Sequence, residues 1–366
     1  MGVLRFILAI AVVLDHTANH NFHLMRGPEA VHVFFIISGF YMCMVIKEKY
    51  TTSARGILYF YINRYLRLWP AYFIVVLMCM AWFYFCRFTT KGTNEVHPIF
   101  NSALFLSDLD LAFIWFANLT LLGVDTLNWF VVKYNGVISL AQSGIIPLST
   151  GDSLWLGYSK WVQQAWTIGS ELWFYLCAPF LIIKWPKISL LLIFTASLIL
   201  KLYYSKIFLH SGYFIWFFWI WLFCLGMGAY LFYKENLDKI KISDQTQKII
   251  LGFILLIYIL PYVLGFRLHE NALFFFSAFS IPILFHLTKR NKVDRFVGEL
   301  SYPIYISHLL TVEICSTIIT LFKINNSYLI IFNIGLCIFV SLCLVLFIDN
   351  PIETLRKKIA AASNKS

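Results

Sequence analysis

Two ionisable side chains, Arg5 and His16, stand eleven residues apart at the start of the chain, with the apolar run 6–14 between them. On an α-helix, eleven steps of about 100° return to within about 20° of the starting direction, so both side chains share one face, about 16.5 Å apart along the axis. An imidazole titrates near neutral pH and can act as a general base. Charges in a bilayer usually face a protein interior or a wet cavity, so this face is a candidate functional site.

Two arginines, Arg64 and Arg67, stand three residues apart in the segment YFYINRYLRLWP, residues 59–70. Residues at i and i+3 share a helix face. Contact with lipid headgroups alone would explain such a pair. However, with the N-terminus in the cytoplasm Arg5 lies on the same side of the membrane as Arg64 and Arg67. Three guanidinium groups can converge on a polyanion such as a nucleotide phosphate.

A carboxylate, Glu171, stands about one turn inside an apolar span. Because an unpaired carboxylate at that depth neutralises or finds a partner, Glu171 either forms a structural pair or orients a catalytic base. Asp15 is a second candidate for orienting His16, although the two are offset by about 100° on an ideal helix. A second histidine, His308, lies one to two turns into a later span, where a satisfied structural role is the commoner one.

The small pair Ser38-Gly39 interrupts another apolar span. Small residues at such a point either let a second helix approach closely or expose backbone to a ligand. Both explanations stay open, and Ser38 is a candidate ligand-binding residue.

Transmembrane helices would hold these residues at membrane depth, and the composition of the chain predicts such helices. The 366-residue chain is 60% hydrophobic and 13% charged, whereas a soluble domain is roughly 45–50% apolar and about 25% charged. Apolar windows of about 20 residues therefore predict ten transmembrane spans. These lie near residues 4–18, 30–47, 69–86, 165–184, 188–205, 212–233, 248–266, 271–288, 302–322 and 328–348. The predicted fold class is all-α, a polytopic transmembrane helix bundle.

The distribution of basic residues predicts the orientation of the spans. With the N-terminus inside, the inner segments carry 20 of the 29 Lys and Arg residues. They are Arg5, five residues within 47–67, two within 184–187, four within 234–248, four within 289–295 and four within 356–365. Both termini are therefore expected to be cytoplasmic. Topology and anionic lipid explain the net charge of +11 without nucleic-acid binding. We expect a multi-pass protein of the plasma or inner membrane.

The largest segment outside the predicted spans, residues 87–164, is assigned to the external side. It contains Trp115, Trp129, Trp155 and Trp161. Flat aromatic faces with polar neighbours suit a sugar ring, and they equally suit an interfacial aromatic belt.

The predicted domain organisation is simple. A membrane-embedded domain covers residues 1–349 and includes the external loop, and a short basic cytoplasmic tail covers 350–366. The eight cysteines form no CxxC motif and no Cys/His cluster, so we expect them to be buried apolar groups and expect no metal.

The ordered motifs resemble the acyltransferase 3 family, integral-membrane acyltransferases that modify carbohydrates. In chain order they are the Arg-x10-His pair of Arg5 and His16, FFIISGF at 34–40, the arginine-rich segment ending at 70, WTIGSELWFY at 166–175, SYPIYISH at 301–308 and FIDNP at 347–351. No single motif is specific, but their order and spacing cover nearly the whole chain. Asn63 and Leu66 stand where many relatives have additional arginines, so the arginine cluster is thinner here.

The resemblance implies transfer of an acyl group from acyl-CoA to a hydroxyl of a cell-surface or lipid-linked glycan. Arg5, Arg64, Arg67 and Ser38 are then the candidate donor-binding residues, and the pantetheine arm would run along the first helix toward His16. Acetyl-CoA is the commoner donor in the family, and a longer or charged acyl-CoA such as succinyl-CoA is the alternative.

The resemblance also implies roles in the reaction. His16 would act as the general base, or would itself become acylated and pass the group on. Glu171 and Asp15 complete the candidate catalytic set as orienting residues. The candidate acceptor-binding residues are Trp166, Tyr302 and His308.

A transporter or flippase of glycans or acyl groups is the alternative function. It would also have about ten apolar spans with polar residues at depth, and interrupted helices are common in transporters. Against it, no internal repeat relates the two halves of the chain. A scaffold protein would have no reason to keep charges at membrane depth. The favoured interpretation is an enzyme that meets a carbohydrate acceptor on the extracytoplasmic side of the bilayer; whether it forms a homo-oligomer is left open.

Overall fold

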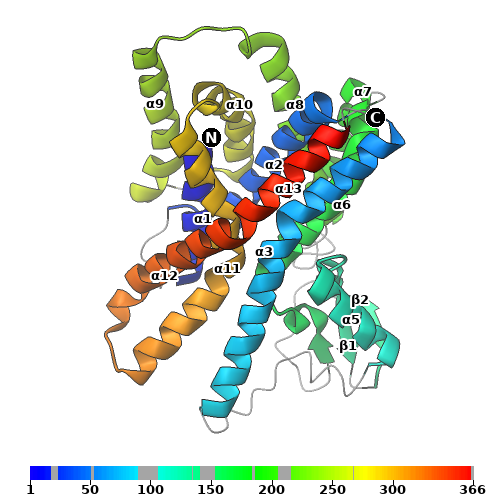
Figure 1. Cartoon of the computed structure of the whole chain (residues 1–366), viewed down its shortest axis with the longest axis vertical. Coiled ribbons are helices and arrows are strands. Elements are labelled where there is room, and N and C mark those ends of the chain that lie inside the picture. Colours follow the sequence, from blue (N-terminus) through cyan, green and yellow to red (C-terminus); the bar gives the residue numbers. More distant parts are fainter. Residues whose placement is uncertain are drawn as a thin grey trace.

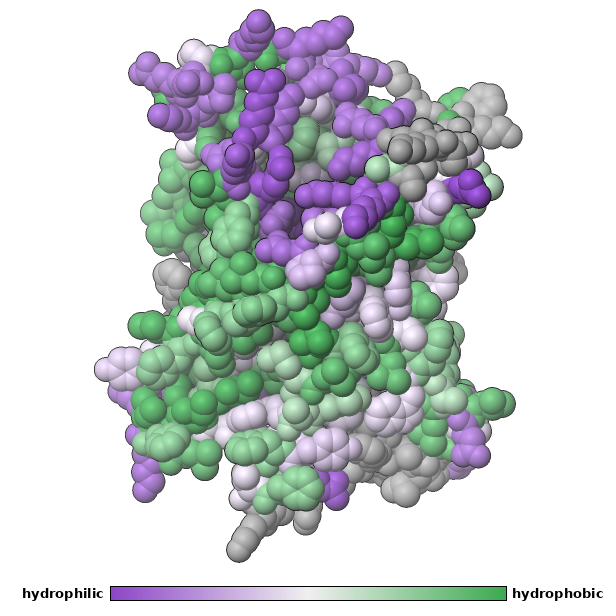
Figure 2. All heavy atoms as spheres, viewed as in Figure 1, coloured by the Kyte–Doolittle hydropathy of each residue, from purple (hydrophilic) through white to green (hydrophobic). Residues whose placement is uncertain are grey.

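The computed structural model describes residues 1–17, 24–50, 53–89, 106–133, 135–140, 153–183, 186–204, 216–266 and 268–363. This part of the chain is a bundle of helices with one small sheet (Figure 1), which confirms the predicted all-α polytopic fold. Eight of its helical segments are long and apolar enough to cross a membrane. Figure 2 shows hydrophilic residues gathered at the upper end of the molecule, above a largely hydrophobic surface.

Although residues 212–215 of the sixth span lie outside the described residues, each of the ten predicted spans overlaps a helix. These are α1 (Gly2–Thr17), α2 (Gly27–Lys49), α3 (Ala54–Thr89), α6 (Trp166–Ile183), α7 (Pro186–Tyr204), α8 (Ile220–Phe232), α9 (Asp244–Val263), α10 (Glu270–Thr288), α11 (Lys292–Leu321) and α12 (Leu329–Leu344). Two helices begin much earlier than predicted, α3 and α11. A hydropathy window stops at charged residues, whereas the backbone hydrogen bonds of a helix continue through them. The arginine-rich segment 59–70 is therefore part of α3, which is continuous through Pro70.

Close packing holds α2 at the centre of the bundle against α8. A Cβ atom on Gly39 would lie 2.0 Å from the carbonyl oxygen of Phe223, and one on Gly226 would lie 1.9 Å from that of Ile36. Both glycines are thus required by the distance between the two helices, as expected for small residues at a helix crossing. This accounts for the glycine of the Ser38-Gly39 pair.

A second close contact joins α1 to α11. Asp294, in the first turn of α11, accepts hydrogen bonds from the backbone N–H groups of Gly2 (2.8 Å) and Val3 (2.9 Å). A carboxylate here satisfies N–H groups that the first turn of a helix leaves free. The contact fixes the start of α1, and therefore Arg5, relative to α11.

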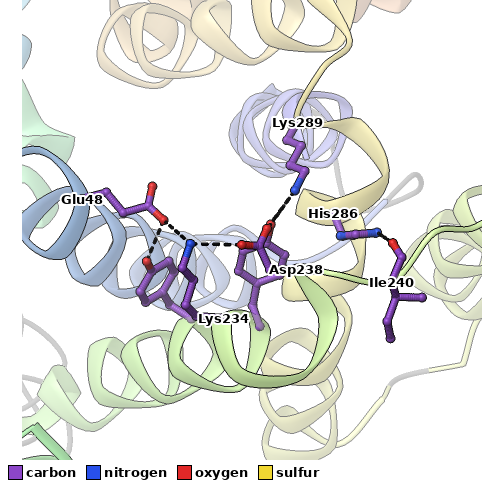
Figure 3. Close-up of polar contacts among 8 residues, drawn as sticks. Glu48, Lys234, Asp238, Ile240, His286 and Lys289 are labelled. Atoms are coloured by element: carbon purple, nitrogen blue, oxygen red, sulfur yellow. Dashed lines mark hydrogen bonds and ion pairs between the residues drawn. The ribbon is translucent and has the colours of Figure 1, made fainter.

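An ion-pair network ties α2, α8 and α10 together (Figure 3). Asp238 follows the π-helical turn η6 (Tyr233–Leu237) and lies 3.0 Å from the ammonium groups of both Lys234 and Lys289. Lys234 also lies 3.3 Å from Glu48 at the end of α2. Hydrogen bonds from the Tyr233 hydroxyl and from the two lysines hold the pKa of Asp238 below its usual range.

The segment between α3 and α6 contains α5 (Asp108–Thr120) and a three-stranded sheet. Strand β1 (Phe130–Lys133) pairs antiparallel with β2 (Ile138–Leu140) and with β3 (Ser153–Trp155). Helix α5 lies against the middle of α3, where Tyr65 donates to the Thr120 carbonyl (2.9 Å) and Tyr72 to that of Asn118 (2.7 Å). Part of the predicted external loop therefore returns along a membrane helix.

Residues 350–363 of the predicted tail form α13 (Asn350–Ser363), which packs on α3. A π-helical turn, η8 (Val345–Asp349), leads from α12 into it. Pro351 has no backbone N–H, so the regular hydrogen-bond pattern is interrupted at this point. Arg356 of α13 is buried; its Nε donates to Asn63 Oδ1 (3.1 Å), and Asn63 Nδ2 donates to the Arg356 carbonyl (2.9 Å).

Candidate active site

A cavity of about 720 Å³ lies between α1, α2, α3, α6, α11 and α13. The four candidate donor-binding residues, Arg5, Ser38, Arg64 and Arg67, all line it, although they come from three different helices. Arg356 also lines it. Arg295 is the fifth arginine of the lining, and we call this space the arginine cavity.

Positive charge predominates on the walls of the arginine cavity. Eight basic side chains line it, namely Arg5, Lys49, Arg64, Arg67, Lys289, Arg295, Arg356 and Lys357. Five acidic side chains do so, namely Glu171, Asp294, Glu299, Asp349 and Glu353. The Nε atom of Arg64 is buried and has no hydrogen-bond partner among the described residues. The cavity therefore offers unused donors and a net positive charge to an anionic ligand.

Sequence reasoning missed Arg356, which lies in the segment interpreted as a tail. Asn63 is the residue on which Arg356 is held. Its side-chain oxygen accepts from Arg356 and from Arg64 NH2 (3.3 Å). A fourth arginine thus reaches the cluster from the other end of the chain. In the sequence, Arg356 is distinguished only as a charged residue within the amphipathic segment 350–363.

Glu171 faces the arginine cavity from α6. It accepts hydrogen bonds from the hydroxyl groups of Ser38 on α2 and Tyr175 on α6. Asp15 lies elsewhere, at the start of α2, where a Cβ atom on Gly27 would be 2.8 Å from its carboxylate. The structure therefore puts Glu171 among the donor-binding candidates and Asp15 at a helix junction.

His16 and His308 face each other across α1 and α11. Their ring centroids are 4.9 Å apart, with the rings tilted by 59°. His16 Nδ1 lies 2.9 Å from the Val12 carbonyl oxygen, and His308 Nδ1 lies 2.6 Å from that of Tyr305. A carbonyl oxygen only accepts, so each Nδ1 is the donor, and in the neutral form of each imidazole the lone pair is on Nε2.

The surroundings of the two imidazoles differ. His308 is fully buried, and its Nε2 has no hydrogen-bond partner among the described residues. His16 is exposed. The exposed imidazole of this pair is the one open to a ligand, and an imidazole in such a position can accept and pass on a proton.

The arginine cavity ends close to this histidine pair. Its lining residues include Phe34, Thr167 and Tyr305, but neither His16 nor His308. Tyr305 is three residues before His308, and their ring centroids are 5.7 Å apart. The Thr167 hydroxyl donates to the Tyr305 hydroxyl at 2.9 Å. Tyr305 therefore stands between the end of the cavity and the imidazoles.

The remaining predicted residues take separate positions. Tyr302 lines the arginine cavity and donates to the Leu68 carbonyl at 2.6 Å, so it lies on the wall shared with the arginines. Trp166 is buried at the start of α6. No group of three or more His, Cys, Asp or Glu side chains in the described chain is arranged to hold a metal ion.

A comparison with protein families matches residues 1–348 of the chain to the acyltransferase 3 model, described as an acyltransferase domain. No curated protein and no solved structure matches the chain. The match ends just before α13, so Arg356 lies outside it.

Proposed function

Since the chain belongs to the acyltransferase 3 family, we propose that it transfers an acyl group, most commonly acetyl, from cytosolic acyl-CoA to a hydroxyl of an extracytoplasmic glycan. The observation that carries this proposal is the arginine cavity, whose walls carry more basic than acidic side chains and include Tyr305, a ring neighbour of His308, which in turn faces His16.

The arginine cavity suits the two chemical halves of an acyl-CoA. Its volume, about 720 Å³, lies within the range of roughly 300–1,000 Å³ that is typical of small-molecule sites. Arg64, Arg67 and Arg356 would hold phosphate oxygens through charge-assisted hydrogen bonds. The apolar side chains of Val31, Phe35 and other residues line the same cavity and would contact the less polar pantetheine arm.

The histidine pair would carry the chemistry. His16 Nε2 takes the proton from the acceptor hydroxyl as that oxygen attacks the thioester carbonyl carbon. The carbon–sulfur bond breaks, the new ester forms, and the proton passes from the imidazolium to the departing thiolate, which leaves as free CoA. His308 Nε2, beside His16, would accept a hydrogen bond from the imidazolium or from the hydroxyl. Acylation of His16 itself is the second route.

Sidedness follows from the predicted orientation. With both termini in the cytoplasm, the arginines lie toward the cytosol and His16 toward the opposite side. The donor and the acceptor would then approach the histidines from opposite faces of a plasma or inner membrane.

Release of free thiol tests the proposal. Purified protein in detergent is given acetyl-CoA and a deacylated surface polysaccharide, and the CoA thiol is measured; succinyl-CoA is compared as the donor. We expect acceptor-dependent thiol release, and a glycan heavier by one acyl group in mass spectra. A transporter would release no thiol where no membrane gradient exists, so the absence of thiol release with either donor contradicts the proposal.

A further inference from the structure

A second cavity, of about 230 Å³, is lined by side chains of Trp82, Phe83, Tyr158 and Trp161, and we call it the aromatic cavity. Its polar lining residues include Lys160, Gln164 and Glu313. None of these residues lines the arginine cavity.

The two cavities follow one another along the same helices. Helix α3 contributes residues within 64–68 to the arginine cavity and residues within 79–83 to the aromatic cavity. Helix α11 contributes residues within 294–305 to the first and within 306–313 to the second. Along α11 the lining of the first cavity therefore ends at Tyr305 and that of the second begins at Ile306. Ile306 and Leu309 of the aromatic cavity flank His308 in sequence, although neither His308 nor His16 lines that cavity.

Gln164 contacts α11 at Tyr305 and Ile306, and only the nitrogen of its side-chain amide is hydrogen-bonded. Its Nε2 donates to the carbonyls of Tyr305 (3.3 Å) and Ile306 (2.6 Å). Its Oε1 is buried and has no hydrogen-bond partner among the described residues, and the residue is only 7% exposed. Buried polar atoms are nearly always paired in native structures, so this acceptor on the cavity wall indicates a ligand that donates a hydrogen bond.

The charges of the aromatic cavity differ from those of the arginine cavity. Its charged lining residues are one base, Lys160, and one acid, Glu313. The Lys160 ammonium is already bound to Asn128 Oδ1 at 2.5 Å, and burial lowers its pKa to about 7. No positive charge is therefore in excess to bind a carboxylate, and Glu313 would repel one.

The size and the aromatic walls of the aromatic cavity limit which ligand it can hold. Sites for drug-sized ligands usually exceed roughly 300 Å³, so a cavity of about 230 Å³ holds a smaller molecule. Aromatic walls offer flat apolar faces together with polar edges, which suits one sugar ring.

We propose that the aromatic cavity is the acceptor site and binds one uncharged pyranose ring, a hydroxyl of which donates to Gln164 Oε1. The inference rests on the proposed function, because the glycan is its acceptor. The acidic sugars are excluded by Glu313, and the remaining residues of the glycan stay outside the cavity.

The test uses the full chain in detergent and saturation-transfer NMR. The probes are neutral methyl pyranosides (gluco, galacto, manno and rhamno) and the acidic methyl glucuronide. We expect at least one neutral probe to bind more tightly than the glucuronide. Gln164→Met should weaken that binding about tenfold, through loss of one hydrogen-bond partner. Gln247→Met, at the start of α9 and outside both cavities, is the matched control and should bind as the wild type does.

A second variant keeps the proposal testable if Gln164→Met fails to fold. Glu313→Gln removes only the negative charge, so it should bind methyl glucuronide more tightly than the wild type while neutral probes are unaffected. Absence of binding by every neutral probe, or binding that neither variant changes, would overturn the proposal.

Calorimetry with CoA separates this proposal from the proposed function. Gln164→Met should bind CoA as the wild type does, because Gln164 does not line the arginine cavity. If the wild type binds a neutral pyranoside through Gln164 but binds no CoA, the donor assignment fails and the sugar site stands. If CoA binds and sugar binding is insensitive to Gln164, the sugar site fails alone.

Discussion

The imidazole rings of His16 and His308 lie 4.9 Å apart, although nearly the whole chain separates the two residues in sequence. Each Nδ1 donates to a backbone carbonyl of its own helix, so Nε2 is the nitrogen that each neutral imidazole leaves available. This pairing changes the interpretation of His308 from a structural group to a partner of His16.

Replacing the exposed member of the pair should stop the reaction. We expect His16→Ala to lower turnover by at least about 10²-fold, the usual contribution of a general base, with folding and membrane insertion unchanged. Thiol release by the purified variant measures this. His269→Ala, which removes an exposed histidine just before α10, is the matched control. Near-normal turnover by His16→Ala would remove His16 from the mechanism.

The two histidines should behave as one unit. His308→Ala is expected to reduce turnover strongly by itself, yet to add little to the loss already caused by His16→Ala, because residues that act together are not additive. Turnover of both single variants and the double variant measures the coupling. Fully multiplicative losses would mean that the two imidazoles act independently.

The arginines of the arginine cavity should set the affinity for the donor. Arg64→Ala with Arg67→Ala, and separately Arg356→Met, should each weaken CoA binding by about tenfold or more, since a hydrogen bond to a charged group contributes roughly 1.5–3 kcal/mol. Calorimetry measures the affinity, and Lys358→Met, an exposed change on α13, is the control. Because Arg356 also holds α13 to α3, melting temperatures are recorded in parallel. An unchanged affinity would mean that these arginines only anchor helices or lipid.

Two glycines of α8, two residues apart, should respond in opposite directions. Gly226→Ala puts a methyl group 1.9 Å from the Ile36 carbonyl oxygen, whereas nothing lies within 4 Å of the same atom on Gly228. We expect Gly226→Ala to cost about 1–3 kcal/mol or more through overpacking. Gly228→Ala should gain roughly 0.5–1 kcal/mol as an ordinary helix substitution. Apparent melting temperatures in detergent give the comparison, and a fall of equal size in both variants would contradict the packing argument.

The connecting region between α3 and α6 should show a pH-dependent stability. Burial raises the pKa of Asp125 from 3.8 to about 7, so the folded protein keeps a proton that the unfolded chain has already lost. The stability from this group is fully present below pH 3.8 and is lost as the pH rises to about 7. Asp125→Asn still accepts from Trp173 Nε1 but does not titrate.

Melting curves between pH 4 and 7 test this linkage. The Asp125→Asn variant should lose less stability than the wild type as the pH rises through that window. Parallel curves for the two proteins would show that Asp125 contributes nothing to the pH dependence.

The sequence by itself determined the helices and the chemical types at the site. Apolar runs long enough for a bilayer identify spans, because no other regular structure satisfies the backbone there without a partner strand. Local spacing also identified Arg5, His16, Arg64 and Arg67, because neighbours on a helix face are set by a period of 3.6 residues. The predicted starts of α3 and α11 were wrong, because both helices begin in polar residues that precede the apolar run.

Only the tertiary structure decided which distant residues meet. The contacts of His308 with His16, of Arg356 with Asn63, and of Gln164 with Ile306 each join separate helices. Such contacts depend on helix rotation and on approach distances, which glycines such as Gly39 permit and which no local pattern specifies. The division of the interior into a cationic cavity and an aromatic one follows from that packing.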